Sequence, residues 1–256
     1  MSKNFELMQQ AARDHGLGIT PVRNASKPTV SVREAVSRSA NETQVNFDAM
    51  AQEEALRLVQ RTFFLQSEKG PRVVVFAGID QGNGCSQICV RVAKTLATNV
   101  RGSVCLVEGN FRSPTLPGLF GTTNHYGLTD SLLKDGPIRS FARLVHGENL
   151  WLISSGSLAS DSSNLLNSER IKARFEELRE EFDYVLIDAP PLIRYADATA
   201  LGRLTDGFVL ILEANSTRRE AALKVTESLR AAQIPLLGAV LNKRTFPIPD
   251  SLYRRL

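Results

Sequence analysis

Short hydrophobic runs alternate with amphipathic stretches from about residue 46 to the end of the chain. Runs of roughly four to seven apolar residues predict buried strands, and apolar positions three or four residues apart predict helices. The expected strands cover residues 72–78, 103–109, 149–156, 183–191, 206–214 and 235–243. The expected helices cover residues 47–65, 85–98, 127–135, 140–146, 168–182, 196–204 and 217–233. This alternation predicts an α/β fold, with a doubly wound, mostly parallel sheet and helices on both faces.

The first 45 residues have a different pattern. They are polar, with little apolar periodicity, and are interrupted by Gly16, Gly18, Pro21 and Pro28. A segment that cannot bury enough apolar surface does not fold on its own. We therefore predict a flexible N-terminal segment over residues 1–45 and a single domain over residues 46–256.

The composition narrows the class of protein and its location. The 256-residue chain has a formal net charge of +4, and its lysines and arginines are scattered rather than clustered with aromatic residues, so nucleic acid is not an expected partner. Its 3 cysteines include no CxxC pair, which argues against a zinc site and fits a reducing cytoplasm. No apolar run approaches the ~20 residues that span a bilayer. We expect a cytoplasmic protein that reaches the inner face of the plasma membrane only through a partner.

The segment GNGCS, residues 82–86, joins the first predicted strand to a helix. Gly82 and Gly84 allow the sharp turn that brings successive backbone N–H groups toward an anion, and the helix N-terminus adds partial positive charge. Ser86 supplies the hydroxyl that binds Mg²⁺ in a phosphate-binding loop of the P-loop NTPase type. Glycine-rich turns of this kind also occur as plain connections between strand and helix, so the loop alone leaves both interpretations open.

Cys85 stands where a phosphate-binding loop has its lysine. A thiol carries no positive charge, a thiolate would repel phosphate, and Asp80 adds a negative charge nearby. The missing charge-assisted contact costs about 1.5–3 kcal/mol of binding free energy, and the loss of transition-state stabilisation is larger. The helix N-terminus predicts a lowered pKa for the Cys85 thiol, so a redox-sensing role and neutral filling of the lysine position are both open.

Polar residues also follow two other predicted strands. Asp188 ends the apolar strand of YVLIDAPP, where a second acidic residue would hold Mg²⁺ or its water shell. Glu108, Asn110 and Arg112 lie at the end of the strand in VCLVEGNFR. The carboxyl ends of parallel strands meet at one edge of a doubly wound sheet, so we expect these residues and the GNGCS loop to face one crevice.

These segments resemble the bacterial tyrosine kinases of capsule and exopolysaccharide synthesis, the BY-kinases, within the deviant-Walker group of ATPases. The similarity covers about Glu53 to Arg244 and includes VEGNFRSPTLPGLFG, LLNSERIKARFEELREEFDYVLIDAPP and ADATALGRLTDGFVLILEANSTRREA. It implies ATP and Mg²⁺ as cofactors, with the metal at Ser86 and Asp188. Asn242 matches an asparagine that contacts adenine in related ATPases, or is a turn-forming residue. The resemblance places the nucleotide at Gly82, Asn83, Gly84, Cys85, Ser86, Gln87 and Asn242.

The departures from the family pattern fall on residues that carry the chemistry. Cys85 replaces the lysine of the first motif, and Gln87 replaces a threonine. The second motif reads D-x-D-x-R in the family, where the aspartates organise the metal and activate the tyrosine hydroxyl. Here Glu108 and Asn110 replace these aspartates, and Arg112 is retained. Glu108 could still act as a base, whereas Asn110 cannot accept a proton at neutral pH.

Two further family features are altered. The helical E-x-x-R-x-x-R segment that joins subunits into a ring falls on Glu54, Arg57 and Gln60, so its last arginine is lost unless Arg61 compensates. Glu54 and Arg57 are therefore the oligomerisation residues that the resemblance predicts. The C-terminal tyrosine cluster, which neighbouring subunits phosphorylate in the family, is reduced to Tyr253.

The segments that carry the fold are thus kept, while the lysine, the second aspartate and the tyrosine cluster are lost. We expect a catalytically impaired regulatory pseudokinase of exopolysaccharide or capsule biosynthesis, with weak or no ATP binding. The resemblance implies docking on a membrane protein of the chain-length-determinant type, with homo-oligomers or an active paralogue as further partners. The alternatives are an active ATP-dependent tyrosine autokinase and a spatial regulator like the partitioning or division-site ATPases.

Overall fold

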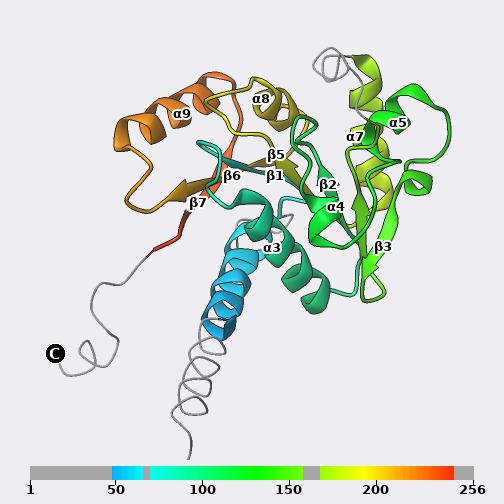
Figure 1. The fold of residues 1–256 in the computed structure, drawn as a ribbon, viewed down its shortest axis with the longest axis horizontal. Coiled ribbons are helices and arrows are strands. Elements are labelled where there is room, and N and C mark those ends of the chain that lie inside the picture. Colours follow the sequence, from blue (N-terminus) through cyan, green and yellow to red (C-terminus); the bar gives the residue numbers. More distant parts are fainter. Residues whose placement is uncertain (1–47, 66–69, 158–167, 245–256) are drawn as a thin grey trace, which may run out of the picture. The chain divides into compact units, whose positions relative to one another are not determined.

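The computed structural model describes residues 48–65, 70–157 and 168–244 (Figure 1). The N-terminal segment predicted over residues 1–45 and the C-terminal Tyr253 lie outside these ranges. None of the helices within them is long and apolar enough to cross a membrane.

A seven-stranded sheet forms the centre of the described domain. Its strands are β1 (Val73–Gly78), β2 (Val104–Glu108), β3 (Arg143–His146), β4 (Leu150–Ile153), β5 (Tyr184–Ala189), β6 (Gly207–Glu213) and β7 (Leu236–Asn242). They lie in the order β3-β4-β2-β5-β1-β6-β7. Neighbouring strands are parallel except β3 and β4, which are antiparallel. The predicted α/β fold with a mostly parallel sheet is confirmed.

Helices cover both faces of this sheet (Figure 1). They are the segment 48–59 and its continuation η1 (Gln60–Phe64), α3 (Cys85–Asn99), α4 (Leu116–Leu119), α5 (Leu128–Leu133), α7 (Glu169–Glu181), α8 (Asp197–Gly202) and α9 (Arg219–Ala231). Side chains alternate along a strand, so β1 contributes to two cores. Val73, Val75 and Ala77 pack with α5, α7, α8 and α9, whereas Val74 and Phe76 pack with α3, α4 and the helix of residues 48–64.

Two short elements differ from the sequence prediction. The prediction of a helix over residues 140–146 is wrong. This segment contains the end of the 3₁₀ helix η2 (Ile138–Phe141), followed by β3. Pairing with the edge of β4 satisfies the backbone of β3, and a bulge between Leu144 and His146 breaks its register. The short helix α4 was not expected, since its sequence LPGL is typical of a turn. Pro117 has no backbone N–H. It is tolerated there because N–H groups in the first turn of a helix make no hydrogen bond within the helix.

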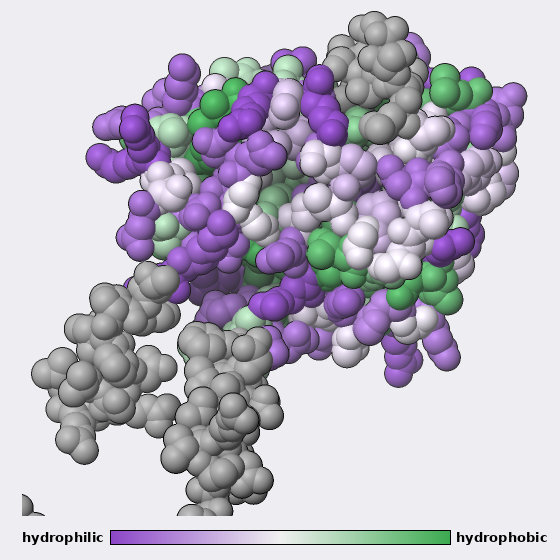
Figure 2. Space-filling view, in the orientation of Figure 1, coloured by the Kyte–Doolittle hydropathy of each residue, from purple (hydrophilic) through white to green (hydrophobic). Residues whose placement is uncertain are grey.

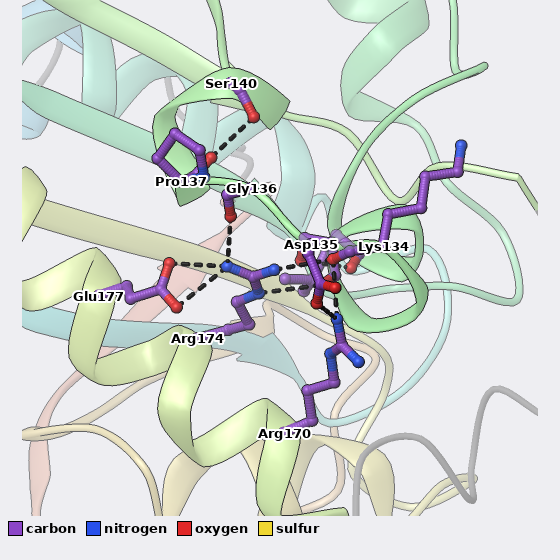
Figure 3. Close-up of polar contacts among 10 residues, drawn as sticks. Lys134, Asp135, Gly136, Pro137, Ser140, Arg170, Arg174 and Glu177 are labelled. Carbon is purple, nitrogen blue, oxygen red and sulfur yellow. Dashed lines mark hydrogen bonds and ion pairs between the residues drawn. The ribbon is translucent and has the colours of Figure 1, made fainter.

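A buried arginine connects α7 to the end of α5. Arg174 is only 5% exposed, and its guanidinium donates to the carbonyl oxygens of Ser131, Lys134 and Gly136 at 2.8–2.9 Å (Figure 3). It also donates to the carboxylate of Glu177 at 2.7 Å. The last carbonyl groups of a helix lack helical donors, and Arg174 supplies donors to this turn.

We expect Arg174→Ala to lower the free energy of unfolding by about 2–4 kcal/mol, because it removes the donor to the buried Ser131 carbonyl oxygen and the donors to two part-buried carbonyl oxygens. Arg170→Ala is the matched control, since Arg170 lies on the same helix, also donates to the Lys134 carbonyl and is half-exposed. It should cost less than about 1 kcal/mol. Denaturant unfolding of both variants measures the difference, and equal losses would contradict the role assigned to Arg174.

Candidate functional site

Three neighbouring strands bring the predicted residues to one edge of the sheet. β5 lies between β2 and β1, and all three are parallel, so their carboxyl ends lie side by side. Glu108 on β2 is the register partner of Asp188 on β5. Ala189 on β5 pairs with Ala77 on β1, just before the GNGCS loop. The sheet thus brings the loop and both carboxylates together.

Two glycines in left-handed conformation give the GNGCS loop its sharp turn. Gly82 and Gly84 have φ angles of +87° and +80°, a left-handed conformation that glycine adopts without strain. Gly84 is the N-cap of α3, which begins at Cys85 and runs for 15 residues. The unpaired N–H groups of the first turn therefore face the loop, with the positive end of the helix dipole behind them. Gln87 is exposed on this first turn.

Asn83 fastens the loop to the ends of two other strands. Its side-chain oxygen accepts the backbone N–H of Asp80 at 2.6 Å, and its amide nitrogen donates to Glu213 at the end of β6 at 3.3 Å. The side chain of Asn242, at the end of β7, donates to the Asn83 carbonyl at 2.7 Å. Asn242 also lies so close to Gly84 that a side chain at position 84 would collide with it. The predicted adenine-contacting residue thus holds the loop in this structure.

Cys85 is a neutral thiol rather than a reactive thiolate. Its side chain is half-buried and lies beside Asp188. Burial raises the pKa of the Cys85 thiol well above its ordinary value, and the negative charge of Asp188 raises it further. The lowered pKa predicted from the helix N-terminus is therefore wrong, because burial and a neighbouring carboxylate outweigh the dipole. The redox-sensing alternative loses its basis.

Asp188 is a buried carboxylate at the end of β5. It is 1% exposed, and within the described residues neither of its oxygens has a hydrogen-bond partner of good geometry. Burial raises its pKa, while the Ser86 hydroxyl and Cys85 thiol lie nearby and lower it. An unpaired carboxylate in an apolar setting is unfavourable unless a cation neutralises it.

The residues at this point fit a magnesium ion. The Asp188 carboxylate and the Ser86 hydroxyl are hard oxygen ligands, which Mg²⁺ prefers. Within the described ranges no group of three or more His, Cys, Asp or Glu side chains can hold a metal. Mg²⁺ at a phosphate site needs no such cage, because one or two protein oxygens suffice beside phosphate and water.

Glu108 is buried like Asp188 but is fully engaged. One carboxylate oxygen accepts the backbone N–H groups of Thr115 and Leu116 at 2.7 and 2.8 Å, and the other accepts that of Asn110 at 3.3 Å. Burial raises the pKa of Glu108, as does the charge of Asp188, while the three N–H donors lower it. Glu108 thus caps the start of α4 and holds the loop after β2.

Asn110 and Arg112 serve different parts of that loop. The Asn110 side chain accepts the backbone N–H of Ser113 at 3.3 Å, within its own turn. The Arg112 guanidinium reaches the segment after β5, where it donates to Asp197 at 3.2 Å and stacks 4.5 Å from the centre of the Tyr195 ring. The two contacts of Arg112 hold the β2 loop against the residues that follow β5.

The predicted oligomerisation residues lie on the exposed surface of the helix over residues 48–59. The Arg57 guanidinium donates to Glu53 at 2.6 Å and to Glu54 at 2.8 Å, all on the same helix. They belong to a separate surface and take no part in the contacts of the strand-edge site.

Sequence reasoning missed two charged groups beside the loop. Arg194, in the segment after β5, contacts Asp80 and Gln81. Glu213 accepts hydrogen bonds from Asn83 and, at 3.1 Å, from Lys243. The sequence pattern indicates that Glu213 lies at a strand end, but it gives no sign that Arg194 contacts Asp80 and Gln81.

The fold, in which a glycine loop leads from a parallel strand into a helix and carboxylates lie on neighbouring strand ends, is of the P-loop NTPase type. The septum site-determining protein MinD complexed with Mg-ADP, from Pyrococcus horikoshii, has this fold, with a TM-score of 0.58 and 18% identity over 72% of this chain and 76% of that one. The chimerical protein CapA2B2 aligns with a TM-score of 0.71 and 24% identity, over 76% of this chain and 85% of that one.

Sequence similarity then gives the family. The chain is 30% identical over 179 residues to the tyrosine-protein kinase YwqD of Bacillus subtilis (strain 168), which is 70% of this chain and 75% of that relative. No protein-family model matches the chain. The chain belongs to the bacterial tyrosine-protein kinase family.

In the absence of Mg²⁺ and nucleotide, we expect Asp188→Asn to raise the free energy of unfolding by about 1–3 kcal/mol at neutral pH. The pKa of Asp188 is raised in the folded state. Above about pH 4 the folded state therefore binds more protons than the unfolded chain, and the free energy of unfolding of the wild type falls as the pH rises. Asparagine removes this effect, so the advantage of the variant should grow between pH 4 and neutrality. Thermal unfolding across this range measures it.

Glu108→Ala is the matched comparison, because Glu108 is the register partner of Asp188. This change leaves the buried N–H group of Leu116 and the part-buried N–H group of Thr115 without this acceptor, so it should destabilise the protein by about 2–4 kcal/mol. If Asp188→Asn and Glu108→Ala destabilise the protein to a similar extent, the different roles given to the two carboxylates are wrong.

Proposed function

We propose that this chain is a regulatory member of its kinase family in capsule or exopolysaccharide biosynthesis, in which phosphoryl transfer is impaired and Mg-nucleotide binding is weak. The observation that carries the proposal is the neutral, half-buried thiol of Cys85 in an otherwise intact phosphate loop. A protonated thiol beside Asp188 adds no positive charge where the terminal phosphates would lie.

The energetic consequence differs between binding and catalysis. Loss of one charge-assisted contact weakens nucleotide binding by about 1.5–3 kcal/mol. The backbone N–H donors of the loop remain, so some binding is retained. Phosphoryl transfer depends more strongly on charge stabilisation of the transferring group, so its rate falls further. A pocket that binds nucleotide weakly and transfers phosphate poorly is the expected result.

The second motif supports the same conclusion. Both oxygens of Glu108 accept backbone N–H groups, so its carboxylate is occupied with holding the β2 loop. The Asn110 amide cannot accept a proton from a tyrosine hydroxyl at neutral pH. We assign Glu108 a structural role and Arg112 the role of orienting the loop against Asp197.

The nucleotide contacts that we propose are those of the loop and its surroundings. Backbone N–H groups of residues 82–87 would cradle the phosphates, and Ser86 and Asp188 would hold Mg²⁺, which neutralises phosphate charge when bound. Asn242 already contacts the loop, and in the bound state it would lie near the base.

The partners are proposed from family resemblance. A solved relative in fold is the chimerical protein CapA2B2. We propose a membrane protein of the chain-length-determinant type as the partner that brings this chain, from the cytoplasm, to the inner face of the membrane. Glu54 and Arg57 lie exposed, as an oligomer contact requires, so self-association or assembly with an active paralogue would use this helix.

Calorimetric titration with ATP and ADP, with and without Mg²⁺, tests the proposal. We expect weak, Mg²⁺-dependent binding, and we expect Cys85→Lys to tighten it by about tenfold or more, because the lysine restores one charge-assisted contact. Cys85→Ala is the control, since it fills the position without adding charge and should leave the affinity within a few-fold.

Two outcomes would contradict the proposal. Tight binding by the wild type, unaffected by Cys85→Lys, would favour the active autokinase. Absence of binding at millimolar nucleotide, with no recovery in Cys85→Lys, would leave a protein-binding scaffold on an ATPase fold.

A further inference from the structure

The phosphate loop lies among carboxylates and has lost its lysine. Asp80 precedes Gly82, Asp188 lies beside Cys85, and Glu213 accepts a hydrogen bond from Asn83. A nucleotide brings further negative charge to this position, so a positive group from elsewhere in the chain would favour its binding in addition to Mg²⁺.

Arg194 brings a positive charge to the two residues that immediately precede the GNGCS loop. Its Nε donates to the Asp80 carboxylate at 3.3 Å, and its Nη1 donates to the side-chain oxygen of Gln81 at 3.0 Å. Asp80 is itself fixed, because its carboxylate also accepts the backbone N–H of Gln81 at 2.8 Å. The guanidinium is therefore held next to Gly82, at the start of the cradle.

The backbone before Arg194 is hydrogen-bonded to the end of β1, which leads into the loop. The N–H groups of Leu192 and Ile193 donate to the carbonyl oxygens of Gly78 and Ile79 at 3.0 and 3.1 Å. The segment after β5 therefore runs beside the end of β1, and these hydrogen bonds fix the position of the backbone just before Arg194. Figure 2 shows one face of the molecule, on which hydrophilic residues are widespread. With its side chain 51% exposed, Arg194 can turn toward an anion without breaking a buried contact.

Two other described cations, Arg112 and Lys243, contact residues outside the loop. Arg112 donates to Asp197 and stacks on Tyr195. Lys243 pairs with Glu213, which lies between it and Asn83. Neither contacts a residue of the loop directly in these interactions.

We infer that Arg194 replaces the lost lysine as the phosphate-facing cation of this site, and that its ligand is the terminal phosphate of a Mg-bound nucleoside di- or triphosphate. Its two contacts use two of the roughly five N–H donors of a guanidinium, so the remainder are available to a phosphate oxygen. A planar guanidinium matches phosphate geometry and needs no shift in protonation. Pairing with Arg194 also neutralises Asp80, which would otherwise repel the anion. This inference rests on the proposed weak nucleotide binding.

Calorimetric titration of the full chain with Mg·ATP, Mg·ADP and Mg·pyrophosphate tests the inference. Arg194→Ala and Arg194→Gln should each weaken all three by about tenfold or more, because each removes the same phosphate contact. Arg230→Ala is the control, since Arg230 is an exposed cation at the far end of α9 and should change nothing. In the Cys85→Lys background the effect of Arg194→Ala should shrink, because the two cations serve the same group.

The outcomes separate this inference from the proposed function. If the wild type binds nucleotide and both Arg194 variants bind equally well, the role of Arg194 is wrong while weak binding stands. If the wild type binds none of the three ligands at millimolar concentration, both fall. Weaker ATP binding with unchanged pyrophosphate binding would overturn the phosphate contact, since Arg194 would then act elsewhere on the nucleotide. Thermal unfolding of each variant checks that the fold is intact.

Discussion

In-register parallel pairing of β2, β5 and β1 is the constraint on which the site depends. Each strand ends at the same edge of the sheet, so the GNGCS loop, Glu108 and Asp188 are brought to one place although they are separated along the chain. The pairing fixes positions but not charges. The fold can therefore persist while individual side chains at the strand ends change, because β1, β2 and β5 remain buried on both faces whatever follows them.

The two paired carboxylates show how these changes alter chemistry. Glu108 has become a structural acceptor whose oxygens hold the β2 loop and the start of α4. Asp188 has a buried carboxylate with no hydrogen-bond partner of good geometry among the described residues, so a bound cation would stabilise it. With Cys85 neutral, the cation that we propose for the site is Arg194, which contacts Asp80 and Gln81 just before the loop. On this proposal, the same substitutions weaken nucleotide binding less than they slow phosphoryl transfer.

Much of this architecture could be predicted from the sequence, because strand and helix periods are local and glycines mark the loop. The seven residues 140–146 were too few to separate a helix from an edge strand. The pKa of Cys85 depends on burial and on Asp188, which is a hundred residues away in the chain, so the local helix dipole gave the wrong direction. Arg174 could have been noticed, because it interrupts the apolar face formed by Ile171, Phe175 and Leu178. Arg194 could not, because its partners come from a different strand end.

The central claim is that the site keeps a nucleotide-binding frame and has lost efficient phosphoryl transfer. The most direct test is to incubate the purified chain with saturating Mg·ATP and to measure phosphotyrosine by mass spectrometry against an unincubated sample. The account predicts no accumulation of phosphotyrosine under conditions in which calorimetry detects bound nucleotide. Phosphotyrosine that accumulates in proportion to time and is abolished by Asp188→Asn would contradict it, and would identify an active kinase that works without the lysine.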